Sequence, residues 1–244
     1  DKHLDLTIVK PEMLEHGWEL PEDNIFGVKY LYEVYLQSDP HYTGRVTVPV
    51  LWDLKNKKIV NNESSQIIRF LNNHFNNDAD YPELDLYKDS QRNEIDQINE
   101  LVYGDINNGV YQCGFATSQD AYQHAFKRLF KALDYVEERL KHQRYLVKGG
   151  CSEADWRLFT TLIRFDAVYH GHFKCNLRRI EDYPNISHYL RDLYQTSGIS
   201  STVHLEECKR HYYFSHTMIN PTQIIPLGPM EDFARPHNRQ KIPL

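Results

Sequence analysis

The chain has few cysteines, and they lack the spacings at which cysteines usually bind metals or form redox motifs. Its 244 residues contain four cysteines, with neither a C-x-x-C pair nor a zinc-ligand spacing: Cys113, Cys151, Cys175 and Cys208. So few thiols in a chain of this size are typical of a reducing compartment. We therefore expect a cytoplasmic protein.

Long apolar runs, a basic surface and clustered histidines are also lacking. No stretch of 18 apolar residues occurs, and the opening DKHLDLTIVK resembles neither a signal peptide nor a transit peptide. The 34 acidic and 28 basic residues are spread along the chain and give a net charge of -6. The 13 histidines show no H-E-x-x-H or comparable spacing. Membrane, nucleic-acid and metal partners are therefore not expected.

What the chain does have is enough apolar material for a large core. Hydrophobic residues make up 41% of the sequence and aromatic residues 13%, which suits one large domain or two small ones. The chain opens on Asp1 and runs directly into a strand-like segment, whereas a complete reading frame opens with Met. We expect that an N-terminal segment is missing.

The first 72 residues have the pattern of a small α/β unit. Alternation and β-branched residues predict a strand from Leu4 to Val9, which Pro11 ends. Residues 24–37 suggest a loop and a short helix. The next segments predict a strand interrupted by a proline at Arg45–Trp52 and a turn at Lys55–Lys58. They also predict a returning strand at Lys58–Val60 and a capped helix start at Asn61–Ser65.

After a polar, turn-rich linker at 73–86, the period becomes helical. Apolar residues recur at intervals of three and four and give one buried helix face: Phe126, Leu129, Leu133, Val136 and Leu140. Ser152 to Asp155 resembles a capping box with Asp in place of Glu, and a further helix is predicted at 183–194, with Pro184 in its first turn. Residues 220–244 hold five of the 11 prolines, so we expect an irregular tail laid on the surface.

Several long motifs, in order, identify a resemblance. GRVTVPVLWD (44–53) followed by IVNNESSQIIRFLN (59–72) resembles the glutathionyl-hydroquinone reductases, the Xi class of glutathione transferases. NNGVYQCGFATSQ (107–119), RFDAVYHGHFKC (164–175) and HYYFSHTMINPTQIIPLGP (211–229) are similar to the helical domain and tail of that class.

The resemblance implies an α/β plus all-α chain with the glutathione-transferase fold. An incomplete thioredoxin-like, glutathione-binding domain is expected at residues 1–78, and an all-helical domain at 86–244 with a Pro-rich tail from about 220. The family's nucleophile is the Cys of a Cys-Pro-Trp-Ala motif, and no cysteine precedes Cys113 here. We expect the nucleophile upstream of this chain and no catalytic residue within it.

By the same resemblance, five residues bind glutathione: Trp18, Arg45, Val48, Glu63 and Ser64. A cis-proline after Val48 would expose the Val48 backbone for pairing with an extended peptide, although Pro49 alone is equally a strand terminator. Glu63 and Ser64 stand at a helix start that favours a carboxylate, Glu63 itself suits an ammonium, and ordinary capping is compatible with both. Trp18 is expected to pack on glutathione. Arg45 either pairs with a carboxylate or is a solvated charge.

Three tyrosines are the candidates for the aromatic substrate. Tyr111 and Tyr212 match positions that line the family's hydroquinone pocket, and Tyr169 is a weaker candidate of the same kind. A phenol offers both an aromatic face and a hydrogen-bonding tip, although with 17 tyrosines in the chain an arbitrary one is more often core or surface.

The resemblance implies an enzyme that reduces glutathionyl-hydroquinones to hydroquinones by cysteine thiol exchange and releases glutathione disulfide. Glutathione is the co-substrate, no metal is used, and a homodimer is expected. Two alternatives stay open. One is an Omega-like thiol transferase or dehydroascorbate reductase. The other is a non-catalytic transferase-fold module that binds glutathione or a partner protein.

Overall fold

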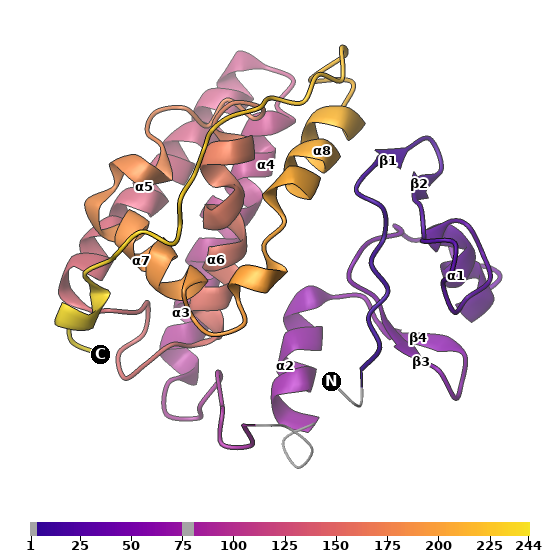
Figure 1. Ribbon diagram of the computed structural model, residues 1–244, viewed down its shortest axis with the longest axis horizontal. Coiled ribbons are helices and arrows are strands. Elements are labelled where there is room, and N and C mark those ends of the chain that lie inside the picture. The colour runs from indigo at the N-terminus through magenta and orange to yellow at the C-terminus, as the bar shows by residue number, and fades with distance from the viewer. Residues whose placement is uncertain (1–3, 75–80) are drawn as a thin grey trace. The chain divides into compact units, whose positions relative to one another are not determined.

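Two units divide the chain, residues 1–84 and residues 85–244 (Figure 1). The computed structural model describes residues 4–74 and 81–244. The predicted linker at 73–86 therefore lies partly outside the described residues. No helix in the described part of the chain is long and apolar enough to cross a membrane.

The first unit contains two small antiparallel hairpins and two helices. Met13–Leu14 (β1) pairs with Gly17–Trp18 (β2), and Leu51–Asp53 (β3) pairs with Lys58–Asn61 (β4). Helix α1 spans Leu31–Ser38 and α2 spans Ser64–His74. The buried core of this unit comes from α1 and the second residue after β2: Leu20, Leu31, Val34 and Tyr35.

The predicted hairpin, short helix and helix start are confirmed by β3, β4, α1 and α2. The strand predicted at Leu4–Val9 is wrong, and the strand predicted at Arg45–Trp52 forms only at its end. Residues 4–10 form no strand, and the segment predicted at Arg45–Trp52 becomes a strand only at Leu51. The side chain of Leu6 is 84% exposed and that of Ile8 is 62% exposed. A strand needs a hydrogen-bonded neighbour as well as β propensity, and within residues 4–74 no strand pairs with residues 4–10 or 45–50.

One buried hydroxyl fixes the chain between α1 and β3. The hydroxyl of Tyr35 donates to the carbonyl of Thr47 at 2.8 Å and accepts from the Thr47 N–H at 3.2 Å. The Asn62 side-chain amide donates to the same hydroxyl at 3.2 Å and to Thr47 Oγ1 at 3.3 Å. This small network therefore holds residue 47 and residue 62, two positions before the start of α2, on one side chain of α1.

The second unit is helical. Its α-helices are Arg92–Leu101 (α3), Asn108–Gly114 (α4), Gln119–His142 (α5), Glu153–Arg164 (α6), Pro184–Tyr194 (α7) and Leu205–Ser215 (α8). Two π-helical segments, Val102–Asn107 (η2) and Phe165–Tyr169 (η3), continue α3 and α6. Short 3₁₀ segments lie at Ile180–Asp182 (η4), Ser200–Thr202 (η5) and Arg239–Lys241 (η6).

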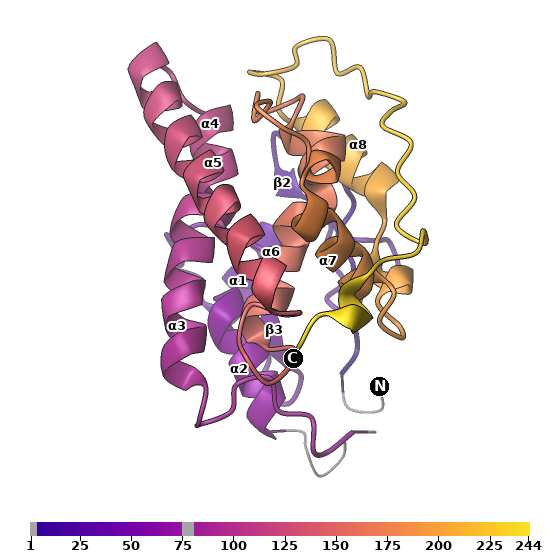
Figure 2. The same ribbon diagram turned by 90° about the vertical axis from the view of Figure 1, so that its left-hand side faces the viewer.

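The helix predicted from the apolar period is confirmed as α5, which packs against α4 and α7 (Figure 2). Its predicted face is buried at Leu129, Leu133, Val136 and Leu140. The helix predicted at 183–194 is confirmed as α7, with Pro184 at its first position. A residue with fixed φ and no N–H is well suited to that position.

A buried carboxylate joins α6 to its neighbours, and it confirms the predicted capping box. Asp155 Oδ1 accepts from the Leu146 N–H and from the Tyr189 hydroxyl, both at 2.8 Å. Its Oδ2 accepts from the Ser152 N–H at 2.8 Å and the Ser152 hydroxyl at 2.9 Å. Burial raises the pKa of Asp155, and the four hydrogen bonds oppose that rise.

The C-terminal tail is irregular apart from η6, as predicted, but one residue of it is not on the surface. Arg239 is fully buried, and its guanidinium donates to the carbonyls of Leu140, Gln143 and Arg144 at 2.8, 2.5 and 3.0 Å. Leu140 lies in the last turn of α5, where helix carbonyls have no partner within the helix, and Gln143 and Arg144 directly follow that helix. The tail, yellow in Figure 1, is thereby tied to α5.

Two buried histidines hold α8 against the segment after η3. His172 Nε2 and His216 Nδ1 are 3.2 Å apart, so one ring donates and the other accepts. Burial lowers the pKa of each imidazole to about 4. Both rings are therefore neutral near pH 7, and a neutral imidazole can act as the donor or as the acceptor of the shared hydrogen bond.

We expect the Asp155→Asn substitution to lower the free energy of unfolding by on the order of 2 to 3 kcal/mol, because an amide group would face donors that need an acceptor. Urea unfolding followed by circular dichroism measures this change. The control is Asp120→Asn on the exposed first turn of α5, with an expected change within about 0.5 kcal/mol. Equal effects of the two substitutions would contradict the role assigned to Asp155.

The histidine pair predicts a loss of stability in acid. An unfolded histidine takes up its proton near pH 6.5 and these two take it up only near pH 4, so protons bind the unfolded chain first as the pH falls from 6.5 to 4. In that window His216→Gln should reduce the slope of unfolding free energy against pH by about 1.4 kcal/mol per pH unit. His124→Gln, on the exposed side of α5, is the control. An unchanged slope in His216→Gln would exclude this source of acid sensitivity.

Candidate functional site

An apolar pocket lies beside the predicted peptide-binding residue of the first unit. The pocket has a volume of about 490 Å³ and is lined by the N-terminal segment, by α1 and by residues 48–52 and 54, among them Val48, Pro49 and Trp52. The peptide bond between Val48 and Pro49 is cis. Val48 is 41% exposed, and its N–H and C=O make no hydrogen bond within residues 4–74 and 81–244. An extended peptide therefore finds two free backbone groups next to an apolar wall.

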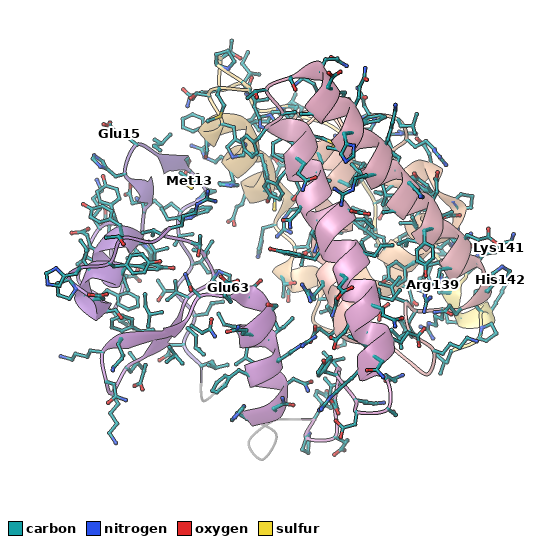
Figure 3. All side chains as sticks on the ribbon, turned by 180° about the vertical axis from the view of Figure 1, so that it is seen from behind. Met13, Glu15, Glu63, Arg139, Lys141 and His142 are labelled. Atoms are coloured by element: carbon teal, nitrogen blue, oxygen red, sulfur yellow. The ribbon has the colours of Figure 1, made fainter. Side chains whose placement is uncertain are left out.

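The start of α2 carries the two predicted polar residues. Glu63 and Ser64 are both exposed, and Figure 3 shows Glu63 at the beginning of the helix. The carbonyl of Glu63 accepts from the N–H groups of Gln66 and Ile67 at 3.0 Å, and Asn61 Oδ1 accepts from the Glu63 N–H at 2.7 Å. The first N–H groups of a helix have no partner within it, and the helix dipole favours an anion there.

The remaining two predicted residues also lie in the first unit. Trp18, in β2, is half-buried and packs against the core cluster around Leu20. Arg45 is exposed, and its carbonyl accepts from the Tyr42 hydroxyl at 2.8 Å. Its guanidinium has no ion pair in the described part of the chain. Arg45 is therefore available to an external carboxylate.

The sequence did not point to the side chains that place these groups. Tyr35 and Asn62 hold Thr47, the residue before Val48, and Asn62 directly precedes Glu63. The network thus fixes both the exposed backbone of Val48 and the start of α2. No local pattern distinguishes Tyr35 from other tyrosines, because its partner lies 12 residues away in an irregular segment.

In the second unit, the three predicted tyrosines form one hydrogen-bonded chain. They come from α4, η3 and α8. The hydroxyl of Tyr212 is hydrogen-bonded to that of Tyr111 and, at 2.9 Å, to that of Tyr169. The rings of Tyr169 and Tyr212 meet edge to face, with centroids 5.3 Å apart. Tyr169 is 2% exposed and Tyr212 is 6% exposed, whereas Tyr111 is 39% exposed. The chain therefore runs from the interior to the surface and ends at Tyr111.

Burial sets the protonation state of the two inner tyrosines. The pKa of Tyr169 and that of Tyr212 are raised, first by burial and then by the neighbouring phenols. The Arg164 guanidinium, at the end of α6, acts in the opposite direction on the pKa of Tyr169. At neutral pH both phenols keep their protons and can donate hydrogen bonds.

Aromatic neighbours that the sequence did not single out complete this cluster. Phe173 stacks on Tyr169 with centroids 5.6 Å apart, and it lies 5.5 Å from Tyr111. Phe115 stacks on Tyr111 at 6.3 Å and is itself 42% exposed. Phe115 directly follows α4, four residues after Tyr111, and that i, i+4 spacing is the sequence signal that points to it.

The chemistry available to these residues is binding and proton donation. The first unit offers free backbone groups, a helix start, a carboxylate and a guanidinium, a set that suits a small zwitterionic peptide. The second offers a neutral phenol chain that suits an aromatic alcohol. In residues 4–74 and 81–244, no cluster of three or more His, Cys, Asp or Glu is arranged to hold a metal ion.

Comparison with known proteins agrees with this arrangement. Residues 119–192 match the family described as glutathione S-transferase, C-terminal domain. The chain is 49% identical over 237 residues to the glutathionyl-hydroquinone reductase PcpF of Sphingobium chlorophenolicum, covering 95% of this chain and 75% of PcpF. It is 47% identical over 244 residues to the glutathionyl-hydroquinone reductase YqjG of Escherichia coli, covering 97% of this chain and 74% of YqjG.

Solved structures give the same relationship. YqjG, solved with glutathione bound, aligns with a TM-score of 0.93 and 46% identity over 96% of this chain and 78% of its own. A Xi-class glutathione transferase from Natrialba magadii aligns with a TM-score of 0.95 and 43% identity, over 98% of this chain and 77% of its own. The predicted glutathione-transferase fold is therefore confirmed. The chain belongs to the glutathionyl-hydroquinone reductases, the Xi class of glutathione transferases.

Proposed function

We propose that this chain supplies the substrate-binding part of an enzyme that reduces glutathionyl-hydroquinones to hydroquinones with glutathione. The observation that carries the proposal is the tyrosine chain, since a phenol at the surface end of a buried phenol network suits an aromatic ring that carries hydroxyl groups. The substrate joins a peptide and such a ring in one molecule. The two sets of residues described above are matched to those two parts.

The peptide part is assigned to the first unit. The backbone of Val48 pairs with the extended tripeptide, the start of α2 at Ser64 receives the γ-glutamyl carboxylate, and Glu63 receives the ammonium group. Arg45 pairs with the remaining carboxylate, and Trp18 packs against the peptide. Each interaction uses a group that is exposed or at the surface of that unit.

The aromatic part is assigned to Tyr111, with Tyr212 and Tyr169 behind it. In thiol exchange, a cysteine thiolate attacks the glutathione sulfur of the substrate and the bond from sulfur to the ring breaks. Before that bond breaks, one ring hydroxyl passes its proton to the ring carbon that bears the sulfur and becomes a carbonyl. The electron pair of the broken bond then moves through the π system onto the ring's oxygens, restores the aromatic ring and takes up a proton. Donors already aimed at those oxygens stabilise that charge without reorganising, which is the role we assign to the phenol chain.

The remaining steps close the reaction. The cysteine is left in a mixed disulfide with glutathione, and a second glutathione attacks it, releasing glutathione disulfide and the free thiolate. We assign the cysteine to a Cys-Pro-Trp-Ala motif upstream of this chain, because its own four cysteines lie in the helical unit, outside the glutathione residues. We also propose a cytoplasmic homodimer, whose small-molecule partners are glutathione and the glutathionylated aromatic substrate.

The 244-residue chain alone should not reduce a glutathionylated hydroquinone, whereas the same chain joined in frame to a segment carrying Cys-Pro-Trp-Ala should do so. Product hydroquinone and glutathione disulfide are both measured, with the Cys→Ser form of the motif as the control. Turnover by the chain alone would assign the chemistry to one of its own four cysteines. No turnover by either form would favour the binding module, and a preference for dehydroascorbate would favour the Omega-like alternative.

In the active form, Tyr212→Phe should lower kcat/KM for the glutathionylated hydroquinone by about 10- to 100-fold, because it removes the hydroxyl that joins Tyr111 to Tyr169 and keeps the ring. Tyr135→Phe, on α5 and outside the cluster, is the matched control. An unchanged kcat/KM in Tyr212→Phe would exclude the phenol chain from the chemical step.

A further inference from the structure

Two of the four cysteines lie side by side in the helical unit, although they are 62 positions apart in the sequence. Cys113 belongs to α4 and Cys175 to the loop after η3, and the Cys175 Sγ lies 4.0 Å from the carbonyl oxygen of Val110, one turn before Cys113 on α4. Both are free thiols and both are buried, at 2% and 0% exposure. Cys151 and Cys208 lie elsewhere, before α6 and within α8.

Close packing between the two segments brings these thiols together. Gly114, the neighbour of Cys113, lies so close to Phe173 that an added Cβ would stand 2.1 Å from the phenyl ring. Lys174 adopts a φ of 60°, which turns the chain directly after Phe173. The N–H of Cys175 then donates to the carbonyl of Tyr169 at 3.0 Å. The loop is thereby folded back on η3, and the ring of Phe173 packs against Gly114 of α4.

Only one of the two thiols faces an opening. A pocket of about 410 Å³ is lined by Cys113 and its surroundings, including Ser118, Tyr122 and Lys174, and Cys175 is not among its lining residues. The hydroxyl of Tyr122 donates to the Lys174 carbonyl at 2.7 Å and so closes one side of the pocket. A small reagent therefore reaches Cys113 first, with Cys175 directly behind it.

The electrostatics of the pair have the same asymmetry. The hydrogen bond from Cys175 lowers the pKa of Cys113, whereas burial raises it. The pKa of Cys175 is raised by the same hydrogen bond and by burial. Of the two thiols, Cys113 is thus the one whose pKa is lowered by its partner, and it is also the one that lines the pocket. An accessible thiolate beside a second thiol is the arrangement of oxidation-sensitive cysteine pairs.

We propose that Cys113 and Cys175 form an oxidisable pair that hydrogen peroxide converts to an intrachain disulfide. The Cys113 sulfur attacks one peroxide oxygen, the O–O bond breaks, and the departing hydroxide takes a proton to become water. The sulfur of Cys175 then attacks the resulting sulfenic acid, the S–O bond breaks, and a second water leaves with the thiol proton. Two thiols are oxidised by two electrons and one peroxide is reduced to two waters.

The disulfide would join the segments that carry two tyrosines of the aromatic cluster. Tyr111 lies two residues before Cys113 on α4, and Tyr169 lies six residues before Cys175. Oxidation therefore ties α4 to the end of η3 at the base of the phenol chain. The pair is independent of the proposed thiol-exchange chemistry, because it uses neither glutathione nor an upstream cysteine.

Peptide mapping of the full 244-residue chain tests the proposal directly. The reduced protein is treated with hydrogen peroxide, the remaining thiols are alkylated after unfolding, and the chain is cut with trypsin. The four cysteines fall in four different tryptic peptides, 93–127, 149–157, 175–178 and 192–209. The expected product is peptide 93–127 joined to 175–178, with two of the four thiols lost and recovered by dithiothreitol.

Matched substitutions separate the pair from the other thiols. Cys151→Ser and Cys208→Ser should leave the cross-link unchanged, whereas Cys113→Ser should abolish it and leave Cys175 available to alkylation. The mapping of the unmodified chain remains decisive if a substituted chain fails to fold. Four intact thiols after peroxide, a sulfinic acid at Cys113 without a cross-link, or a cross-link through Cys151 or Cys208 would each overturn the proposal.

Discussion

The helical unit depends on one buried carboxylate. Asp155 accepts from the loop before α6, from the first turn of α6 and from α7, through Leu146, Ser152 and Tyr189. A charged or acidic group without solvent is stable only where donors surround it, so the three segments have to meet in one arrangement. Since α6 continues into η3, the position of Tyr169 follows from the same arrangement. The aromatic cluster is thus held by a polar contact at the opposite end of the helix that carries it.

Local patterns predicted the elements that local forces determine. The period of three and four predicted α5, Pro184 predicted the start of α7, and Ser152 with Asp155 predicted the start of α6. The strand predicted at Leu4–Val9 was wrong because β pairing depends on a neighbour, which no residue within the strand can supply. Long-range contacts, such as the burial of Arg239, carry no comparable sequence signal.

The candidate site likewise combines residues that the sequence identified with contacts that the sequence could not predict. The resemblance named Tyr111, Tyr169 and Tyr212, but their shared hydrogen bonds join positions up to 101 residues apart and could not be predicted from spacing. The hydrogen bonds of Tyr35 and Asn62 in the first unit could not be predicted from the sequence either. Motifs therefore identified the residues that face a ligand, whereas the side chains that position them required the structure. Such supporting side chains are held by tertiary contacts and not by the local pattern.

The capping of α5 by Arg239 has a consequence for the order in which the protein folds. The carbonyls at and just after the end of α5 accept hydrogen bonds from a guanidinium that is 95 to 99 residues further along the chain. During synthesis that helix end has to be hydrated, or paired only transiently, until α6, α7 and α8 have been made. Closing so long a loop is slow compared with forming the helix itself. The longest helix of the unit is therefore one of the first elements able to form and one of the last to be completed.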